Sequence, residues 1–273
     1  MIIEHAYAKL NLALDVVRKR KDGYHDLKMI MIPLELCDEL TFEESDEIIL
    51  VSSIEIEHNA ILKTVNLMKE MYQITKGAKI TLDKKIPIGA GLGGGSADIA
   101  ATIRGLNQLW NLELSKQSQE EIALKLGSDT LFCLYNKPAY VYGRGENLLY
   151  ISTPPIKDIY VFYPEIQAST KDVFANHTII FDPLKFNRLF TLYVNEKYKS
   201  FFKKNYNVLT ETTVKLYPEI ELLKRDVTKL SKLARMSGSG STFFIPVFKE
   251  NERKIIKKIA KLPYNVLKTQ VKR

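Results

Sequence analysis

The segment 87–107, PIGAGLGGGSADIAATIRGLN, constrains this chain most, because it places five glycines within seven positions directly before a helical pattern. They are Gly89, Gly91, Gly93, Gly94 and Gly95. Glycine loses more backbone freedom on folding than any other residue, so a loop that holds five of them needs a reason. The loop either adopts positive-φ turns or lets something lie against bare backbone.

Three interpretations of this glycine loop compete. The spacing Gly89-x-Gly91-x-x-Gly94 matches the dinucleotide fingerprint, but that fingerprint needs a strand after the helix, and here a second helical pattern follows. A plain helix start, with small residues for close packing, is the structural alternative. The third interpretation is a phosphate cradle, in which glycine N–H groups form an anion nest and the helix dipole adds positive potential. The hydroxyl of Ser96 could then bond a phosphate oxygen or a magnesium ion.

The composition leaves a globular protein as the expectation. The sequence has no apolar stretch long enough to cross a membrane and no signal-peptide pattern at its start, so we expect a cytoplasmic protein. Cys37 and Cys133 form neither a disulfide framework nor a zinc motif. The net charge of +8 is compatible with nucleic acid or an anionic substrate. The two lysine-rich stretches, 196–207 and 251–262, read more simply as helices with apolar residues inward.

The pattern along the chain predicts two α+β domains, residues 1–153 and 154–273, separated by the linker signal STPP. Strands are expected over most of residues 1–54, with Asp22-Gly23 at a hairpin turn. Helices are expected from Asn59 to Gly77, from Ser96 to Trp110 and from Ser115 to Gly127. A second hairpin is expected at 139–151, and residues 159–164, 218–226, 241–248, 251–262 and 265–271 alternate between strand and helix.

Several motifs in order resemble those of the GHMP kinases. The glycine segment is similar to the second motif of that superfamily, and AYAKLNLALDV, DGYHDL, LGSDTLFCL, TKDVF and MSGSGSTFF resemble others in family order. The triple glycine followed by Ser-Ala-Asp is closest to the branch that acts on 4-diphosphocytidyl-2-C-methyl-D-erythritol. The motifs span residues 6 to 244, and together they are specific.

The resemblance implies a fold and an activity. The fold is α+β, with an N-terminal domain like domain 2 of ribosomal protein S5, a ferredoxin-like C-terminal domain and the active site in the cleft between them. The activity is ATP-dependent phosphorylation of the 2-hydroxyl of 4-diphosphocytidyl-2-C-methyl-D-erythritol, in non-mevalonate isoprenoid synthesis. ATP would arrive with Mg²⁺. The partners are then the small-molecule acceptor and ATP, without membrane or nucleic acid, and the protein is a monomer or a homodimer.

The resemblance also implies roles for individual residues. Asp129 is the expected base and Lys9 the cation that keeps it ionised and stabilises developing charge. Tyr24 and Phe174 would sandwich a cytosine ring whose edge His25 bonds. Asn11 and Thr170 would also bind the acceptor. The expected ATP-binding residues are Pro87, Gly89, Gly91, Leu92, Gly93, Gly94, Gly95, Ser96 and Ala97. No dedicated metal site is expected beyond a candidate magnesium contact at Ser96.

Two positions depart from the family pattern, since Leu131 and Tyr7 stand where it usually has proline. Both prolines would rigidify backbone beside Asp129 and Lys9. Another GHMP kinase, acting on a homoserine- or mevalonate-type acceptor, is therefore an alternative, and it would have no use for the two aromatic plates. An RNA-binding protein on the same N-terminal fold would explain the charge but not the glycine motif, Asp129 and Lys9 together.

Overall fold

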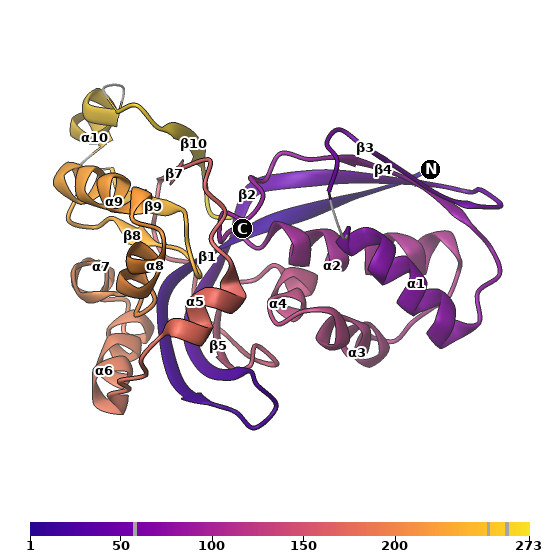
Figure 1. The fold of residues 1–273 in the computed structure, drawn as a ribbon, viewed down its shortest axis with the longest axis horizontal. Helices are drawn as coiled ribbons and strands as arrows, with labels where there is room; N and C mark the ends of the chain where they lie inside the picture. The colour runs from indigo at the N-terminus through magenta and orange to yellow at the C-terminus, as the bar shows by residue number, and fades with distance from the viewer. Residues whose placement is uncertain (57–58, 250–251, 260–261) are drawn as a thin grey trace. The chain divides into compact units, whose positions relative to one another are not determined.

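The structure is a computed structural model that describes residues 1–56, 59–249, 252–259 and 262–273. These residues form an α+β fold that divides into two compact units, each discontinuous in sequence (Figure 1). Unit 1 comprises Met1–Ala8, Leu36–Pro87 and Gly93–Asn136, and unit 2 comprises Lys9–Glu35, Ile88–Leu92 and Lys137–Arg273. The predicted domain boundary between residues 153 and 154 stays a prediction, because grouping by spatial contact need not follow folding domains.

The strands and helices are labelled as in Figure 1. The strands are β1 (Ile2–Lys19), β2 (His25–Glu43), β3 (Ile48–Ser52), β4 (Ala78–Asp83), β5 (Ala139–Gly143), β6 (Asn147–Tyr150), β7 (Asp158–Tyr163), β8 (Arg235–Met236), β9 (Phe243–Val247) and β10 (Asn265–Thr269). The helices are α1 (Ala60–Tyr72), α2 (Gly94–Leu109), α3 (Lys116–Leu126), α4 (Thr130–Tyr135), α5 (Thr170–Asn176), α6 (Pro183–Val194), α7 (Tyr198–Lys204), α8 (Thr210–Leu216), α9 (Glu219–Leu230) and α10 (Glu252–Ile259). Within the described ranges, no helix is long and apolar enough to cross a bilayer.

Unit 1 packs helices α1 to α4 along a sheet. The C-terminal half of β2 pairs antiparallel with β4, with Glu39 opposite Asp83, and β4 pairs parallel with the edge strand β3. Helix α2 is buried along most of its length, which its alanine-rich sequence allows. Gly105 of α2 has no room for a Cβ because the ring of Phe42 on β2 fills that space. The helix that follows the glycine loop is therefore held close to the sheet.

Unit 2 contains the N-terminal half of β2, which pairs antiparallel with β5, and β5 in turn pairs with β6. A separate four-stranded sheet has the order β10-β7-β9-β8. Helix α7 confirms the helical interpretation of the first lysine-rich stretch, since Tyr198, Phe201 and Phe202 are buried and its lysines are exposed. In the second stretch, Ile255 of α10 is buried but Ile256 is exposed, so Ile256 does not belong to the inward face. Residues 251, 260 and 261 of that stretch lie outside the described ranges.

Local sequence signals located most element ends correctly. Asn59 and Ser115 are N-caps whose side chains accept from the backbone N–H groups of Ile61 and Ser118. The expectation that Gly77 ends the first helix is wrong, because α1 ends at Tyr72 with Gln73 in the left-handed conformation at φ 52°. Glycine is the usual residue at this left-handed position after a helix, but here Gln73 occupies it.

Candidate active site

The glycine loop ends in an open helix N-terminus. Gly93 is the N-cap of α2 at φ 72°, and no side chain caps the helix there. The first N–H groups of a helix have no intrahelical partner, so they are available to an anion. A Cβ on Gly95 would meet nothing within 4 Å, whereas one on Gly94 would lie 3.0 Å from Lys84 Nζ. Gly95 therefore leaves free space at the helix start, and Gly94 is needed for packing.

A buried charge cluster lies beneath this helix start, and we call Asp38, Lys84 and Asp98 the acidic–lysine cluster. Lys84 Nζ lies 2.5 Å from Asp38 Oδ2 and 2.7 Å from Asp98 Oδ2. The side chains are 4% exposed for Lys84, 0% for Asp38 and 5% for Asp98. Asp38 Oδ1 also accepts from the backbone N–H groups of Lys85 and Ile86, at 2.6 and 2.7 Å. The cluster thus ties the segment before the loop to the helix after it.

Sequence reasoning missed this cluster. Asp98 is buried, and burial raises its pKa to about 7, although Lys84 acts in the opposite direction. One signal could have found the cluster: Asp38 has the same strand parity as Leu40 and Phe42, both of which are fully buried. An acid on the inward face of a strand needs a buried cation.

Asp129 lies at the start of α4, in the same unit as Ser96. It occupies the N-cap position, yet its carboxylate makes no cap hydrogen bond with the helix. A helix-capping role therefore does not account for this carboxylate. The Gly127 loop passes close to the glycine loop, because a Cβ on Gly127 would lie 3.5 Å from Ser96 Oγ. The base expected from the resemblance and the candidate magnesium contact thus belong to neighbouring loops of unit 1.

Lys9 is a buried lysine in unit 2, held against the loop residues 88–92. Its Nζ donates to Asn11 Oδ1 at 2.9 Å and to the carbonyl of Gly91 at 3.2 Å. Its backbone N–H donates to the carbonyl of Leu92 at 2.9 Å. Lys9 and Asn11 share a strand face, as their spacing of two residues on β1 requires. A lysine that is only 4% exposed is not the solvated surface residue that an outward strand position would give.

Another glycine-containing segment, Ser237–Ser241, contacts the same loop residues, 88–92. We call it the second glycine motif because it follows the glycine loop in the sequence. Ser237 Oγ donates to the Gly91 carbonyl at 3.1 Å. Gly91, at φ 73°, could not carry a side chain, because its Cβ would lie 2.5 Å from the Ser237 carbonyl oxygen. Ser239 Oγ lies 2.9 Å from the hydroxyl of Thr170. The segment Ser237–Ser241 therefore braces loop residues 88–92.

Tyr24, His25 and Phe174, which are expected around a cytosine ring, all lie in unit 2. Two ring contacts involve them. The rings of His25 and Phe174 contact each other, tilted by 31° with centroids 5.1 Å apart. Burial lowers the pKa of His25, which favours the neutral ring. Tyr24 is 50% exposed, and the guanidinium of Arg144 lies 4.7 Å from the centroid of its ring. His25 and Phe174 are therefore direct neighbours in this structure.

The predicted site residues fall into two groups, one in each unit. Unit 2 holds the acceptor residues Tyr24, His25, Asn11, Thr170 and Phe174, together with Lys9, Gly89, Gly91 and Leu92. Unit 1 holds Asp129, Pro87, Gly93, Gly94, Gly95, Ser96 and Ala97. Of the two positions without the family proline, Leu131 is buried in the first turn of α4, and Tyr7 on β1 stacks with His5 at 6.0 Å. Both positions are occupied by packed side chains.

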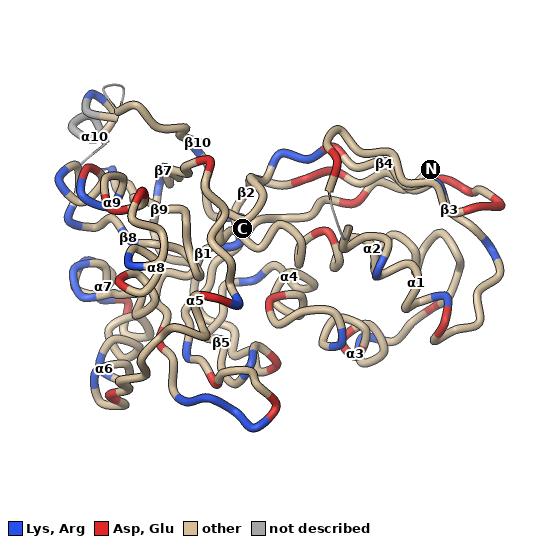
Figure 2. The backbone as a smooth tube through the Cα atoms, in the orientation of Figure 1, with Lys and Arg blue, Asp and Glu red and all other residues tan. Residues whose placement is uncertain are grey.

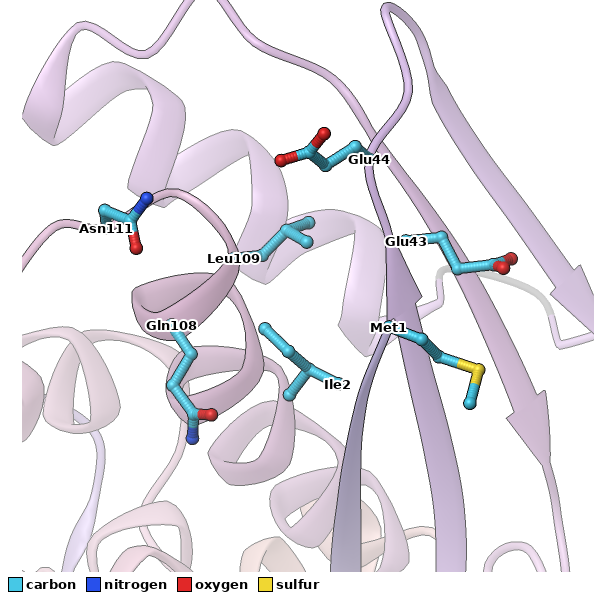
Figure 3. A pocket seen from close by; sticks show the side chains of 7 residues that line it. All are labelled: Met1, Ile2, Glu43, Glu44, Gln108, Leu109 and Asn111. Atoms are coloured by element: carbon cyan, nitrogen blue, oxygen red, sulfur yellow. The ribbon is translucent and has the colours of Figure 1, made fainter.

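A pocket in unit 1 of about 400 Å³ is lined by none of the predicted site residues (Figure 3). It is at the C-terminal end of α2, opposite the glycine loop, and it is lined by Met1, Ile2, Glu43, Glu44, Gln108, Leu109 and Asn111. Two of those side chains are carboxylates, which disfavour a phosphate.

Comparison with known proteins places the chain in a family. A profile of the GHMP kinases N terminal domain matches residues 59–137, which include the glycine loop and Asp129. A 4-diphosphocytidyl-2-C-methyl-D-erythritol kinase from Bacillus subtilis (strain 168) is 40% identical over 253 residues, covering 89% of this chain and 87% of the relative. The relative from Bacillus cytotoxicus, of the same name, is 38% identical over 258 residues and the same shares.

A solved structure agrees with these relatives. The crystal structure of a 4-(cytidine 5'-diphospho)-2C-methyl-D-erythritol kinase superposes with a TM-score of 0.77 at 27% identity, over 99% of this chain and 100% of that chain. The α+β fold expected from the sequence is confirmed by this match. Together with the glycine loop, the buried Lys9 and the second glycine motif, these likenesses show that the chain belongs to the GHMP kinases, in the 4-diphosphocytidyl-2-C-methyl-D-erythritol kinase family.

Proposed function

We propose that the protein transfers the γ-phosphoryl group of ATP to the 2-hydroxyl of 4-diphosphocytidyl-2-C-methyl-D-erythritol, in the non-mevalonate isoprenoid pathway. The observation that carries this proposal is the 40% identity to a relative of that activity over 89% of the chain. The glycine loop supports it independently, since it supplies an uncapped helix start with free space at Gly95.

The residues of the glycine loop fit a nucleoside triphosphate. Phosphoryl transfer depends on positioning and on neutralising charge, and both are available from backbone N–H groups and the helix dipole. No cluster of three metal-ligating side chains occurs among the described residues. Magnesium that travels with ATP needs few protein ligands, because the phosphates and water supply most of its oxygens. We assign Ser96 Oγ as the protein contact for Mg²⁺, and Asp98 is not free for that role because it pairs with Lys84.

The chemistry falls to two charged residues. Asp129 accepts the proton of the acceptor hydroxyl as that oxygen attacks the γ-phosphorus. Lys9 stabilises the negative charge that develops during transfer. The contacts of Lys9 with Asn11 and Gly91 keep the ammonium in one place before substrate arrives, so little reorganisation is needed during the reaction.

Acceptor recognition falls to the aromatic residues of unit 2. Phe174 and Tyr24 would stack on the pyrimidine, and His25 would bond its polar edge. His25 already lies against Phe174, so the residue that would bond the polar edge of the base is next to one that would stack on its ring.

The basic charge does not indicate RNA. Along the described residues, Lys and Arg are distributed over elements of both units and interspersed with Asp and Glu (Figure 2). Many of the acidic side chains pair with them, as Asp26 does with Arg18 and Arg20. Solvated charge on packed elements accounts for the net charge.

One assay separates the candidate acceptors. ADP release is measured with 4-diphosphocytidyl-2-C-methyl-D-erythritol, homoserine and mevalonate in parallel, each with ATP and Mg²⁺. Turnover confined to the cytidyl compound supports the proposal. Turnover with homoserine or mevalonate alone would replace it with another GHMP kinase activity.

A further inference from the structure

The turn between β1 and β2 holds Tyr24 in a fixed backbone position. Its N–H donates to Asp22 Oδ1 at 3.1 Å, and its carbonyl accepts from the backbone N–H of Arg20 at 2.8 Å. Tyr24 is nevertheless 50% exposed. A half-exposed ring with a fixed backbone still has rotamer freedom, unless something packs on its face.

The turn between β5 and β6 supplies that contact through Arg144. The Arg144 guanidinium carbon lies 4.7 Å from the centroid of the Tyr24 ring. Arg144 is placed by its neighbours, because Gly143 and Gly145 take φ angles of 74° and 128°. Its backbone N–H donates to Glu146 Oε2 at 2.5 Å. Only glycine adopts such angles readily, so the turn is built to present this one side chain.

An ionic network connects the two turns. Arg20 Nη1 lies 2.9 Å from Asp26 Oδ1 and 3.7 Å from Glu146 Oε1. Arg20 Nε lies 3.1 Å from Asp22 Oδ2, and Asp22 holds the Tyr24 N–H. Asp22 therefore fixes the backbone of Tyr24 and Glu146 fixes that of Arg144, and Arg20 pairs with both carboxylates. The contact between the two side chains is not an isolated surface encounter.

We infer that Arg144 is a positioning residue of the acceptor site, which packs on one face of Tyr24 and leaves the other face for a pyrimidine ring. The inference rests on the proposed function and deepens it. A bound base would complete a three-layer stack of guanidinium, phenol and pyrimidine. A guanidinium suits the outer layer better than an ammonium, because it is planar and weakly hydrated and stacks on aromatic faces.

The size of the effect follows from the contact. Cation–aromatic contacts at exposed sites correspond to about a two- to fivefold change in affinity. Loss of the guanidinium should therefore raise KM for the cytidyl acceptor by about that factor. It should not change KM for ATP or kcat, because the contact that is lost is the one with the Tyr24 ring.

The test compares steady-state kinetics of four proteins with 4-diphosphocytidyl-2-C-methyl-D-erythritol and ATP. Arg144→Ala should raise the acceptor KM about two- to fivefold, and Arg144→Lys should fall between it and the wild type. The matched control is Lys137→Ala, which removes a cation that lies 5.6 Å from the ring centroid of Tyr150 in the same unit. This control should keep wild-type values, and equal thermal melting of all four proteins would exclude misfolding.

A double-mutant cycle shows whether Arg144 acts through Tyr24. In a Tyr24→Ala background, Arg144→Ala should have no further effect on the acceptor KM. An unchanged KM in the single Arg144→Ala variant overturns the inference, and so does a lowered KM, which would mean that the guanidinium occupies the place of the base. An equal rise in the Tyr24→Ala background also overturns it, because Arg144 would then act on another part of the ligand.

Failure of the proposed function gives a different result. A wild-type protein that does not phosphorylate the cytidyl acceptor overturns that function, and this inference with it. A wild-type protein that is active, with an Arg144→Ala variant that is kinetically identical to it, overturns the inference alone.

Discussion

Replacing Lys84 with methionine should destabilise the protein strongly, because it leaves two buried carboxylates without their cation. Methionine keeps most of the side-chain volume, so the change removes the charge and not the packing. Asp38 keeps its bonds from the N–H groups of Lys85 and Ile86, at 2.6 and 2.7 Å. Asp98 loses more, since its Oδ1 is already a buried atom without a hydrogen-bond partner and its Oδ2 bonds Lys84.

The magnitude follows from burial. All three side chains of the acidic–lysine cluster are at most 5% exposed. Removing one partner of a buried ion pair costs about 3–5 kcal/mol, because a charge is left buried and uncompensated. For a chain of this size, each kcal/mol lowers Tm by about 2–4 °C. We therefore expect a Tm lower by about 6–20 °C at pH 8.

The neighbouring lysine provides the matched control. Lys85 pairs with Asp83 at the surface, where the two side chains are 52% and 57% exposed. Exposed pairs contribute about 0–1 kcal/mol, so Lys85→Met should melt within a few degrees of the wild type. The two variants remove the same charge from adjacent positions and differ only in burial. Urea unfolding and thermal melting measure both.

The pH dependence of the deficit gives a second check. Burial raises the pKa of Asp98 to about 7, while Lys84 acts to lower it, so the Lys84→Met variant should have a still higher pKa at Asp98. Above pH 7 the folded variant then holds a proton that the unfolded chain has released. Stability falls with rising pH wherever the folded state binds more protons. The stability deficit of Lys84→Met relative to the wild type should therefore grow as the pH rises from 7 to 9.

Equal melting of Lys84→Met and Lys85→Met at pH 8 would refute this reasoning. It would mean that the buried carboxylates are neutral or solvated and that the cluster does not hold the loop segment. A deficit that does not change between pH 7 and pH 9 would leave the packing explanation and remove the charge explanation.

Four further results are expected. Asp129→Asn should lower kcat by roughly 10²- to 10⁴-fold with a nearly unchanged KM for ATP, the usual effect of losing a general base, and near-wild-type turnover would remove Asp129 from the mechanism. Gly95→Val should raise KM for ATP at least about tenfold in a folded protein, because a side chain would obstruct phosphate approach where the structure has open space; an unchanged KM would leave the glycine loop a packing feature. Phe174→Ala should raise the acceptor KM by about five- to a hundredfold, the loss expected for one stacked base, and an equal rise in KM for ATP would contradict the pyrimidine assignment. Tyr206→Phe should raise the already raised pKa of Asp15 further, because the Tyr206 hydroxyl bonds that carboxylate at 2.5 Å and acts to lower its pKa, and carboxyl NMR titration would show a downward shift if the reasoning is wrong.

The sequence determined what depends on a few neighbouring residues. Asn59 and Ser115 cap their helices because the cap bonds reach only two or three positions along the chain. Lys9 and Asn11 share a face because strand side chains repeat every two residues. The glycine loop was identified as the start of a helix that can bind an anion for the same local reason, although the helix begins at Gly94, two residues earlier than predicted.

Tertiary structure alone decided which distant residues meet. Lys84 and Asp38 are 46 positions apart, and their pairing depends on the register between β2 and β4, which local propensity does not fix. Gly91 is held by Ser237 from 146 positions away, and Tyr24 is covered by Arg144 from a separate hairpin. Each of these contacts exists because two turns or strands reach the same place only after the sheets have formed. A short-range sequence pattern carries no information about these long-range contacts. The energy of such a contact comes from burial and charge pairing, which the isolated segments do not have.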